Sequence, residues 1–92
     1  TLDAFASFWR SVSTAFANRT SVLGYELLNE PSFSTYLDAV RMGAVDRTYL
    51  TPMYKYLHET IRQIDDRHIL FFEPCVFDIE ETGFTEGPGG SA

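Results

Sequence analysis

The chain has 92 residues, of which 45% are hydrophobic and 22% are charged, and its formal net charge at pH 7 is −6. This composition is that of a globular protein and excludes an intrinsically disordered chain. The acidic balance argues against a nucleic-acid partner, which would need a basic patch on the surface. No apolar run approaches the roughly 20 residues of a transmembrane helix.

The length suits either one small domain or a piece of a larger one. We expect a piece, because the sequence starts at Thr1 without an initiator methionine and stops within the glycine-rich residues 87–92. Oligomeric state and compartment are not predicted by these features. The single cysteine, Cys75, can form no disulfide within the chain, so its redox state stays open.

The first element that the pattern predicts is an amphipathic helix over residues 2–17. Apolar side chains recur there every three to four positions, as they do on one face of a helix. They are Leu2, Phe5, Phe8, Trp9, Val12, Ala15 and Phe16. A polar turn follows at residues 18–21, and residues 22–29 then predict a strand. Apolar residues occupy both parities of that run, which is typical of a parallel strand covered on both faces.

The next stretch, residues 32–50, is mixed in composition and predicts a long loop, with a short helix near residues 35–42. Thr51-Pro52 predicts the start of a second helix. Threonine can cap free backbone amides, and proline suits the first helical position. We expect this helix to extend to residue 65, with Met53, Tyr54, Leu57, Ile61 and Ile64 on its buried face.

The last elements are a short apolar strand over residues 68–73 and a glycine-rich loop over residues 75–92. The order helix, strand, loop, repeated twice, indicates parallel βαβ units. Long loops after both strands, with short turns before them, favour a (β/α)₈ barrel. A doubly wound open sheet would alternate in the same way, but neither strand is followed by a glycine-rich phosphate turn. We therefore predict an α/β fold, in which residues 1–92 are a fragment of a (β/α)₈ TIM barrel.

Candidate chemistry lies where the first strand ends, at Asn29-Glu30-Pro31. Pro31 cannot donate to a sheet ladder and so ends the strand. Glu30 then lies at the carboxyl end, where barrel enzymes carry their catalytic residues. Partial desolvation would keep such a carboxyl protonated to higher pH, which suits a general acid. Asn29 could bind a sugar hydroxyl beside it. The alternative is that Glu30 is a solvated residue in a plain turn.

The chain from residue 22 onward resembles glycoside hydrolase family 5, and in particular its endoglycoceramidase-related branch. Residues 24–31 are similar to the family's fourth-strand signature, which ends in Asn-Glu-Pro. The segments that resemble the branch are residues 45–47, 50–54, 61–65, 69–74, 83–85 and 88–90. The chain departs from the family where Ser32-Phe33 follows the proline, because many members carry a tryptophan or another aromatic there.

The resemblance implies a retaining glycosidase with Glu30 as general acid/base and Asn29 as a substrate-binding residue. The chain would run from about helix three to the loop after strand five of the barrel. The implied substrate is a glycosphingolipid, cut between oligosaccharide and ceramide, with contact to a membrane surface through the lipid. A β-glucan, or a non-catalytic relative, is the alternative. The resemblance implies no cofactor and no metal, and it suggests a secreted, extracellular protein.

Glu73 also ends a strand, and that strand should neighbour the first. Adjacent strands lie about 4.8 Å apart, and a retaining pair needs carboxyl groups about 5–5.5 Å apart. Glu30 and Glu73 could therefore be read as the catalytic pair. The resemblance instead implies a nucleophile on the seventh strand, outside these residues. We interpret Glu73 as a residue that lines the site and binds substrate, or as a satisfied structural carboxylate.

Four other residues are weaker candidates. Glu26 shares strand parity with Glu30 and should face the barrel interior, where a carboxylate needs a partner. His58 is expected to be solvated and His68 to be a turn residue before the second strand; their spacing does not suit a metal site. Cys75 lacks a nearby histidine in sequence, which argues against a nucleophile. Two strands cannot close a barrel, so we expect residues 1–92 alone to be inactive and prone to aggregation.

Overall fold

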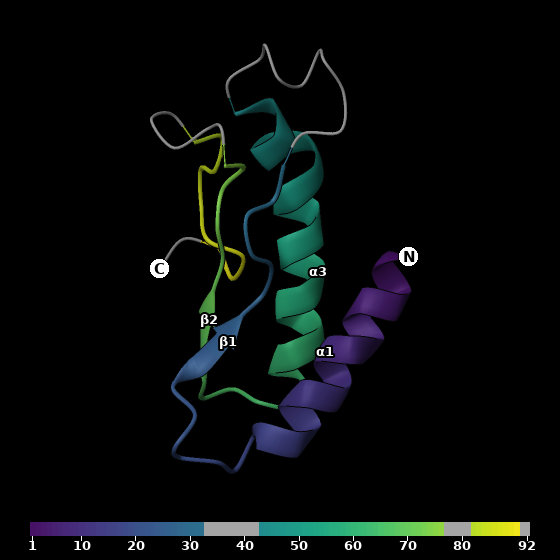
Figure 1. Ribbon diagram of the computed structural model, residues 1–92, viewed down its shortest axis with the longest axis vertical. Coiled ribbons are helices and arrows are strands. Elements are labelled where there is room, and N and C mark those ends of the chain that lie inside the picture. Colours follow the sequence, from purple (N-terminus) through teal and green to yellow (C-terminus); the bar gives the residue numbers. More distant parts are fainter. Residues whose placement is uncertain (33–42, 77–81, 91–92) are drawn as a thin grey trace.

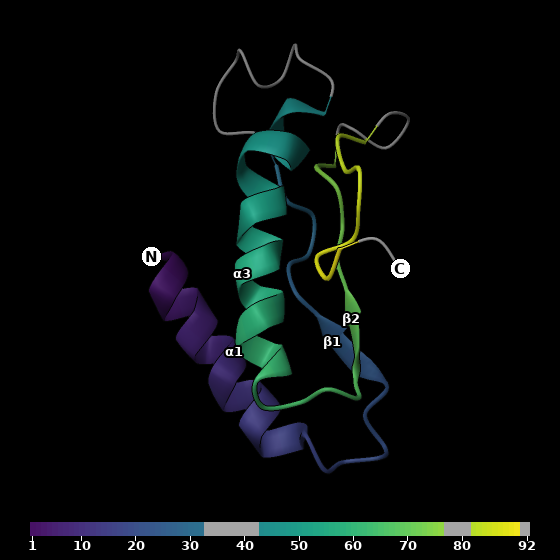
Figure 2. The same cartoon turned by 180° about the vertical axis from the view of Figure 1, so that it is seen from behind.

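The computed structural model describes residues 1–32, 43–76 and 82–90. Two parallel strands lie beside helix α3, and helix α1 packs against α3 (Figure 1; the reverse view is Figure 2). The elements are α1 (Leu2–Phe16), β1 (Gly24–Glu26), the π-helical segment η1 (Asp46–Leu50), α3 (Thr51–Arg62) and β2 (Ile69–Phe71). Within these residues, no helix is long and apolar enough to cross a membrane.

The two strands pair in parallel, with Gly24 opposite Ile69 and Glu26 opposite Phe71. Both are shorter than the sequence predicts, at three residues each. The ladder extends one step further, because the amide of Leu27 donates to the carbonyl of Phe71. Beyond that point the backbone bonds to side chains and loops instead. Gly24 is required for the pairing, since a Cβ there would lie 2.2 Å from the carbonyl oxygen of Ile69.

The prediction of an amphipathic helix over residues 2–17 is confirmed by α1, which spans Leu2–Phe16. The side chain of Thr1 caps it by accepting a hydrogen bond from the amide of Ala4, at 3.1 Å. Ala6, Trp9 and Ser13 are buried. The apolar face is wider than the surface it buries here, because Phe8 is 55% exposed.

The second helical region begins earlier than predicted. Helix α3 continues directly from η1, so Thr51 lies inside a helix and does not cap one. Its hydroxyl donates to the carbonyl of Asp46, at 2.6 Å. Pro52 explains the wide turn, because proline has no N–H and its ring would clash with a regular helical carbonyl four residues earlier. The short helix predicted near residues 35–42, and Phe33, lie outside the described residues.

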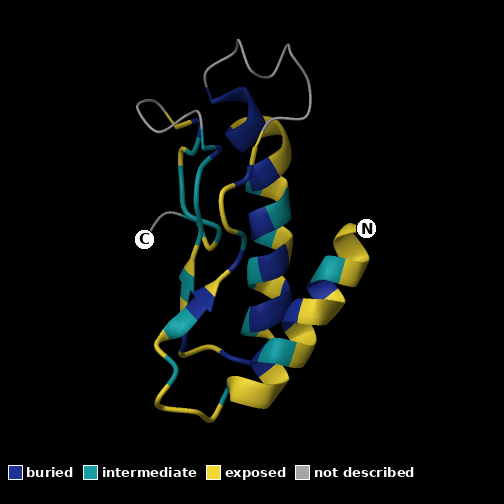
Figure 3. Cartoon of the chain, viewed as in Figure 1, coloured by how far each residue is buried: buried dark blue, intermediate teal, exposed yellow. Residues whose placement is uncertain are grey.

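The core lies between α3, α1 and the strands, where buried residues follow the inner side of α3 (Figure 3). Leu57 and Ile61 are fully buried, as the helical periodicity predicts, and Met53 and Ile64 are partly buried. Tyr25 of β1 is buried against this core, whereas its neighbour Glu26 is exposed. Within the described residues, the buried residues that form the hydrophobic core are Ala6, Trp9, Tyr25, Leu27, Val45, Leu50, Tyr54, Leu57, Ile61 and Cys75.

Candidate active site

Glu30 follows the end of β1 and is exposed. Its backbone has φ 49°, in the left-handed region that residues other than glycine seldom adopt. A strained residue of this kind costs about 1–3 kcal/mol and persists only where its surroundings hold it. Pro31, next in sequence, is buried, and its carbonyl accepts a hydrogen bond from the amide of Val76, at 2.8 Å. The segment around Glu30 is therefore fastened to the loop after β2.

Glu73 supplies a second attachment. Its Oε2 accepts a hydrogen bond from the backbone amide of Glu30, at 3.0 Å. The two strand-end glutamates thus lie together, as the predicted strand order requires. The contact is not one between two carboxyl groups: an oxygen of Glu73 binds the backbone that carries the other glutamate. Asn29 is exposed beside Glu30.

Tyr54 connects helix α3 to this strand end. Its hydroxyl donates to the carbonyl oxygen of Glu73, at 2.9 Å. The side chain is 1% exposed, and burial raises the pKa of Tyr54 to about 12. The phenol therefore keeps its proton at neutral pH and stays a donor. The sequence places Tyr54 on the buried face of its helix but gives no sign of this polar contact, because its partner lies 19 positions away.

Asp46 is a buried carboxylate that sequence reasoning passed over. It is 0% exposed and accepts three hydrogen bonds. Oδ1 receives the amide of Cys75, at 2.7 Å, and Oδ2 receives the hydroxyl of Thr82 and the amide of Gly83, at 2.7 and 2.9 Å. Asp46 therefore ties the start of the helical region to two parts of the loop after β2. Asp46 lies in the first turn of η1, and an acidic residue in a first helical turn is a signal that the sequence could have given.

A different polar cluster lies at the amino ends of the strands. The hydroxyl of Tyr25 donates to Oδ2 of Asp65, at 2.6 Å, and Nδ1 of His68 lies 2.5 Å from the same oxygen. Nε2 of His68 lies 2.9 Å from the carbonyl of Arg19. The prediction that His68 is a turn residue before the second strand is confirmed, since it lies in the bend directly before β2. The sequence did not show that this residue is buried, at 7% exposure, and bonded to other elements. Its partners lie in other elements, which the local sequence does not show.

The charges of this cluster follow from its contacts. Burial alone would raise the pKa of Asp65, but hydrogen bonds from the Tyr25 hydroxyl and from the amides of Arg67 and His68 outweigh it and lower that pKa. The pKa of His68 is raised by its hydrogen bond to the Arg19 carbonyl and, further, by Asp65. Both ring nitrogens face oxygen acceptors, which suits the doubly protonated ring. An Asp–His–Tyr group can resemble catalytic machinery, but here it joins the turns below the strands.

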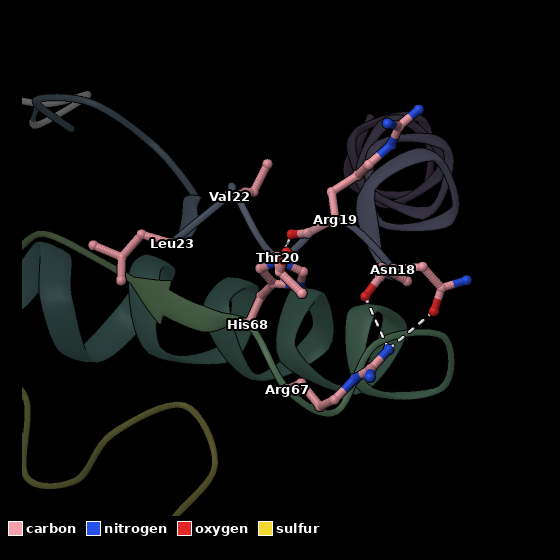
Figure 4. Close-up of a pocket in the computed structure, with 8 residues that line it drawn as sticks. Asn18, Arg19, Thr20, Val22, Leu23, Arg67 and His68 are labelled. Carbon is pink, nitrogen blue, oxygen red and sulfur yellow. Dashed lines mark hydrogen bonds between the residues drawn. The ribbon is translucent and has the colours of Figure 1, made fainter.

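A hollow of about 330 Å³ opens beside this cluster, between the turn after α1 and the turn before β2 (Figure 4). The guanidinium of Arg67 crosses it and donates to the carbonyl of Ala17 and to Oδ1 of Asn18, at 3.1 and 3.0 Å. Val22 and Leu23, which precede β1, also line it. Glu30 follows β1, so the hollow and the candidate catalytic residue lie at opposite ends of the strand.

His58, Glu26 and Cys75 complete the set of weaker candidates. His58 is partly buried on α3, not fully solvated, and burial lowers its pKa. Glu26 is exposed on the strand face opposite Tyr25, and its role as an interior ion-pair partner stays a prediction. Cys75 is buried in the core at 1% exposure, which suits a structural residue. Among residues 1–32, 43–76 and 82–90, no group of acidic, histidine or cysteine side chains could hold a metal ion.

Parallel strands linked through a helix, with glutamates after their carboxyl ends, are the arrangement expected of a segment of a βα-barrel. The cellulase family, glycosyl hydrolase family 5, matches residues 1–81, and the chain belongs to this family. The predicted fold class is confirmed by solved structures. The endo-glycoceramidase II from Rhodococcus sp. superposes with a TM-score of 0.76 at 26% identity, over 92% of this chain and 19% of that one.

Two curated relatives are more similar in sequence. The endoglycoceramidase of Cyanea nozakii is 42% identical over 94 residues, which covers 99% of this chain and 19% of that protein. The endoglycoceramidase of Hydra vulgaris is 41% identical over 91 residues, covering 96% and 18%. The chain thus spans about a fifth of the length of these relatives. The Rhodococcus enzyme is also known in a complex with ganglioside GM3 and as a lactosyl-enzyme intermediate.

Proposed function

We propose that the protein to which this chain belongs is a retaining glycoside hydrolase that cuts glycosphingolipids between oligosaccharide and ceramide. The observation that carries this proposal is the placement of Glu30. It is an exposed acid at the carboxyl end of a barrel strand, in a chain of glycosyl hydrolase family 5. Similarity to two endoglycoceramidases at 42% and 41% identity supports the substrate class.

In the proposed reaction, the carboxyl of Glu30 gives its proton to the glycosidic oxygen as the bond from that oxygen to the sugar breaks. A glycosyl-enzyme forms on the nucleophile. The carboxylate of Glu30 then takes a proton from the water that attacks the sugar, which restores the acid and frees the nucleophile. Asn29 would hold a sugar hydroxyl. The lactosyl-enzyme intermediate of the Rhodococcus enzyme supports such a covalent route.

The proposal assigns no nucleophile within this chain. The attachment of Glu73 to the amide of Glu30 supports this, because one of its oxygens is already engaged at 3.0 Å. Residues 1–92 would then form part of a catalytic barrel whose nucleophile is carried by another strand. A ceramide-bearing substrate lies in a lipid surface, so the barrel mouth would meet a membrane or micelle there.

A β-glucan is the second candidate substrate, because the matching family is described as cellulase. The test uses the full-length protein, assayed side by side on a ganglioside in detergent micelles and on a soluble β-glucan. We expect hydrolysis of the ganglioside with release of ceramide. Turnover of the β-glucan alone would overturn the glycosphingolipid assignment and leave the acid/base assignment standing.

The role of Glu30 is tested in the same protein by Glu30→Gln. Loss of a general acid/base lowers the rate about 10²–10⁴-fold, and we expect kcat on the ganglioside to fall within that range. The matched control is Glu59→Gln, which makes the same change at an exposed position of α3. Its activity should equal that of the wild type. Unchanged hydrolysis by Glu30→Gln would disprove the assignment.

A further inference from the structure

We propose that Glu73 is a positioning residue, which holds the backbone of Glu30 in the conformation that proton transfer requires. This inference rests on the proposed acid/base role of Glu30. It concerns a different residue and a different kind of contact, because Glu73 would act on the catalytic group and not on the substrate.

The first argument is that Glu30 needs an external hold. Its φ of 49° lies in the left-handed region, which a glutamate leaves readily when nothing opposes the change. The contact at this residue is the hydrogen bond from its amide to Oε2 of Glu73, at 3.0 Å. The torsion φ, about the N–Cα bond of Glu30, sets the direction of Cβ relative to that amide. The hydrogen bond to Glu73 therefore helps to fix the direction in which the side chain of Glu30 leaves the backbone.

The second argument is that Glu73 is itself held. Its carbonyl accepts the hydroxyl of Tyr54, at 2.9 Å. The ring of Tyr54 packs against those of Phe72 and Phe84, with centroids 5.4 and 5.9 Å away. A continuous series of contacts therefore runs from helix α3 through Tyr54 and Glu73 to the amide of Glu30. Because the backbone of Glu73 is anchored in this way and its side chain binds Glu30, the residue can transmit the position of the helix to the strand end.

The third argument concerns chemistry. Proton transfer to a leaving oxygen depends on the distance and direction of the acid, and a displacement of about 1 Å can cost about 100-fold in rate. Loosening Glu30 should therefore lower kcat and leave KM nearly unchanged. A residue that binds substrate would instead change KM. These two outcomes separate positioning from direct contact with the substrate.

The experiment compares Glu73→Leu with Glu73→Gln in the full-length protein. Leucine removes the acceptor, whereas the amide oxygen of glutamine can accept the same hydrogen bond from Glu30. On a ganglioside, we expect Glu73→Leu to lower kcat roughly 10- to 100-fold with KM within about twofold. Glu73→Gln should stay within about threefold of the wild type. Equal loss in both variants would overturn the inference.

A second substrate shows whether the lost step is proton donation. An aryl lactoside with a dinitrophenolate leaving group needs no proton on its oxygen, so the burst of phenolate reports the first step without the acid. Glu73→Leu should keep a burst rate close to that of the wild type. A large loss on both substrates, or a raised KM on both, would show that Glu73 contacts the sugar or supports the fold and would overturn positioning.

Glu30→Gln is measured in parallel, because it separates the two proposals. If it loses ganglioside turnover and keeps the aryl burst, the acid/base assignment holds and the result for Glu73 judges the inference alone. If it loses neither, the proposed function fails first.

Should Glu73→Leu fold poorly, as judged by its melting temperature, Tyr54→Phe takes its place. That variant keeps the ring and removes only the hydroxyl. We expect it to lower kcat on the ganglioside about two- to fivefold and to leave the aryl burst rate unchanged. Equal effects on the two substrates would overturn the inference.

Discussion

The two ends of the strand pair use acidic residues in opposite ways. At the amino ends, Asp65 is fully enclosed by the hydroxyl of Tyr25, the ring of His68 and two backbone amides. At the carboxyl ends, Glu30 is exposed, and its contact with Glu73 involves its backbone and not its carboxyl group.

This difference shows which carboxyl group is free to react. An acid whose oxygens are all occupied by donors contributes to stability and offers nothing to a ligand. An acid whose backbone is held while its side chain stays open is suited to meet one. In barrels the amino face generally serves stability and the carboxyl face serves chemistry, and the role proposed for Glu30 is consistent with that division.

The largest effect on this comparison should come from Asp65→Ala. Several buried donors lose their acceptor, at about 1–3 kcal/mol each, so we expect the free energy of unfolding to fall by about 3 kcal/mol or more. Urea unfolding of the full-length protein measures this. Asp66→Ala is the matched control, because that neighbour is exposed. Turnover per folded molecule should not change, and a specific loss of kcat would contradict the division between the two ends.

A smaller loss is expected from Asp46→Asn, at the other end. Asparagine replaces one acceptor oxygen with an NH₂ group, which would face the donors of Thr82 and Gly83. We expect about 2 kcal/mol of destabilisation together with faster hydrogen exchange at the amides of residues 75 and 83. Unlike Asp65→Ala, this change should also lower turnover, since Cys75 lies two residues after Glu73. Unaltered exchange at both amides would show that Asp46 does not hold the loop.

Tyr25→Phe should cost less, at about 1.5 kcal/mol, because one hydrogen bond to a charged group is lost while Asp65 keeps its backbone donors. Tyr49→Phe, at a residue 48% exposed, is the control and should be neutral. Thermal unfolding of both variants decides the matter. Equal melting temperatures for the two would show that the buried hydroxyl contributes nothing.

The smallest effect should be a pH dependence. The pKa of His68 is raised above its ordinary 6.5, so its stabilising contribution is complete below pH 6.5 and is lost as the pH rises through the higher folded value. The pKa of Asp65 is lowered, so its contribution is lost only as the pH falls well below 3.8. The stability difference between wild type and His68→Gln should therefore shrink from pH 6 to pH 9. His58→Gln is the control: burial lowers the pKa of His58, so its effect has the opposite sign and changes only as the pH falls below 6.5. A stability difference that grew with pH at His68 would refute the assignment.

Much of the architecture follows from local sequence. Periodicity predicts α1 and the buried face of α3, whereas β1 ends at Glu26, before the Pro31 that the sequence takes as its end. The neighbouring places of Glu30 and Glu73 follow from the parallel strand order alone. These features depend on residues close together in the chain, or on the general rule for βα units.

The features that sequence reasoning missed are contacts between distant residues. Tyr25 and Asp65 are 40 positions apart, and Asp46 reaches the amide of Gly83, 37 positions away. Neither pair leaves a periodic signal. The start of the second helix was misplaced for another reason, since Thr51-Pro52 has the composition of a helix start and stands instead after a wide turn.

That wide turn has a consequence for insertions and deletions. Each residue of an α-helix advances about 100° around the axis, so η1 sets the angular offset between Asp46 and Tyr54. With this offset, Asp46 meets the amides of the loop after β2 and Tyr54 meets the carbonyl of Glu73. Removing one residue from η1 would shorten the helix by only about 1.5 Å. It would nevertheless turn one of the two anchors away from its partner, so this segment should tolerate substitution far better than a change in length.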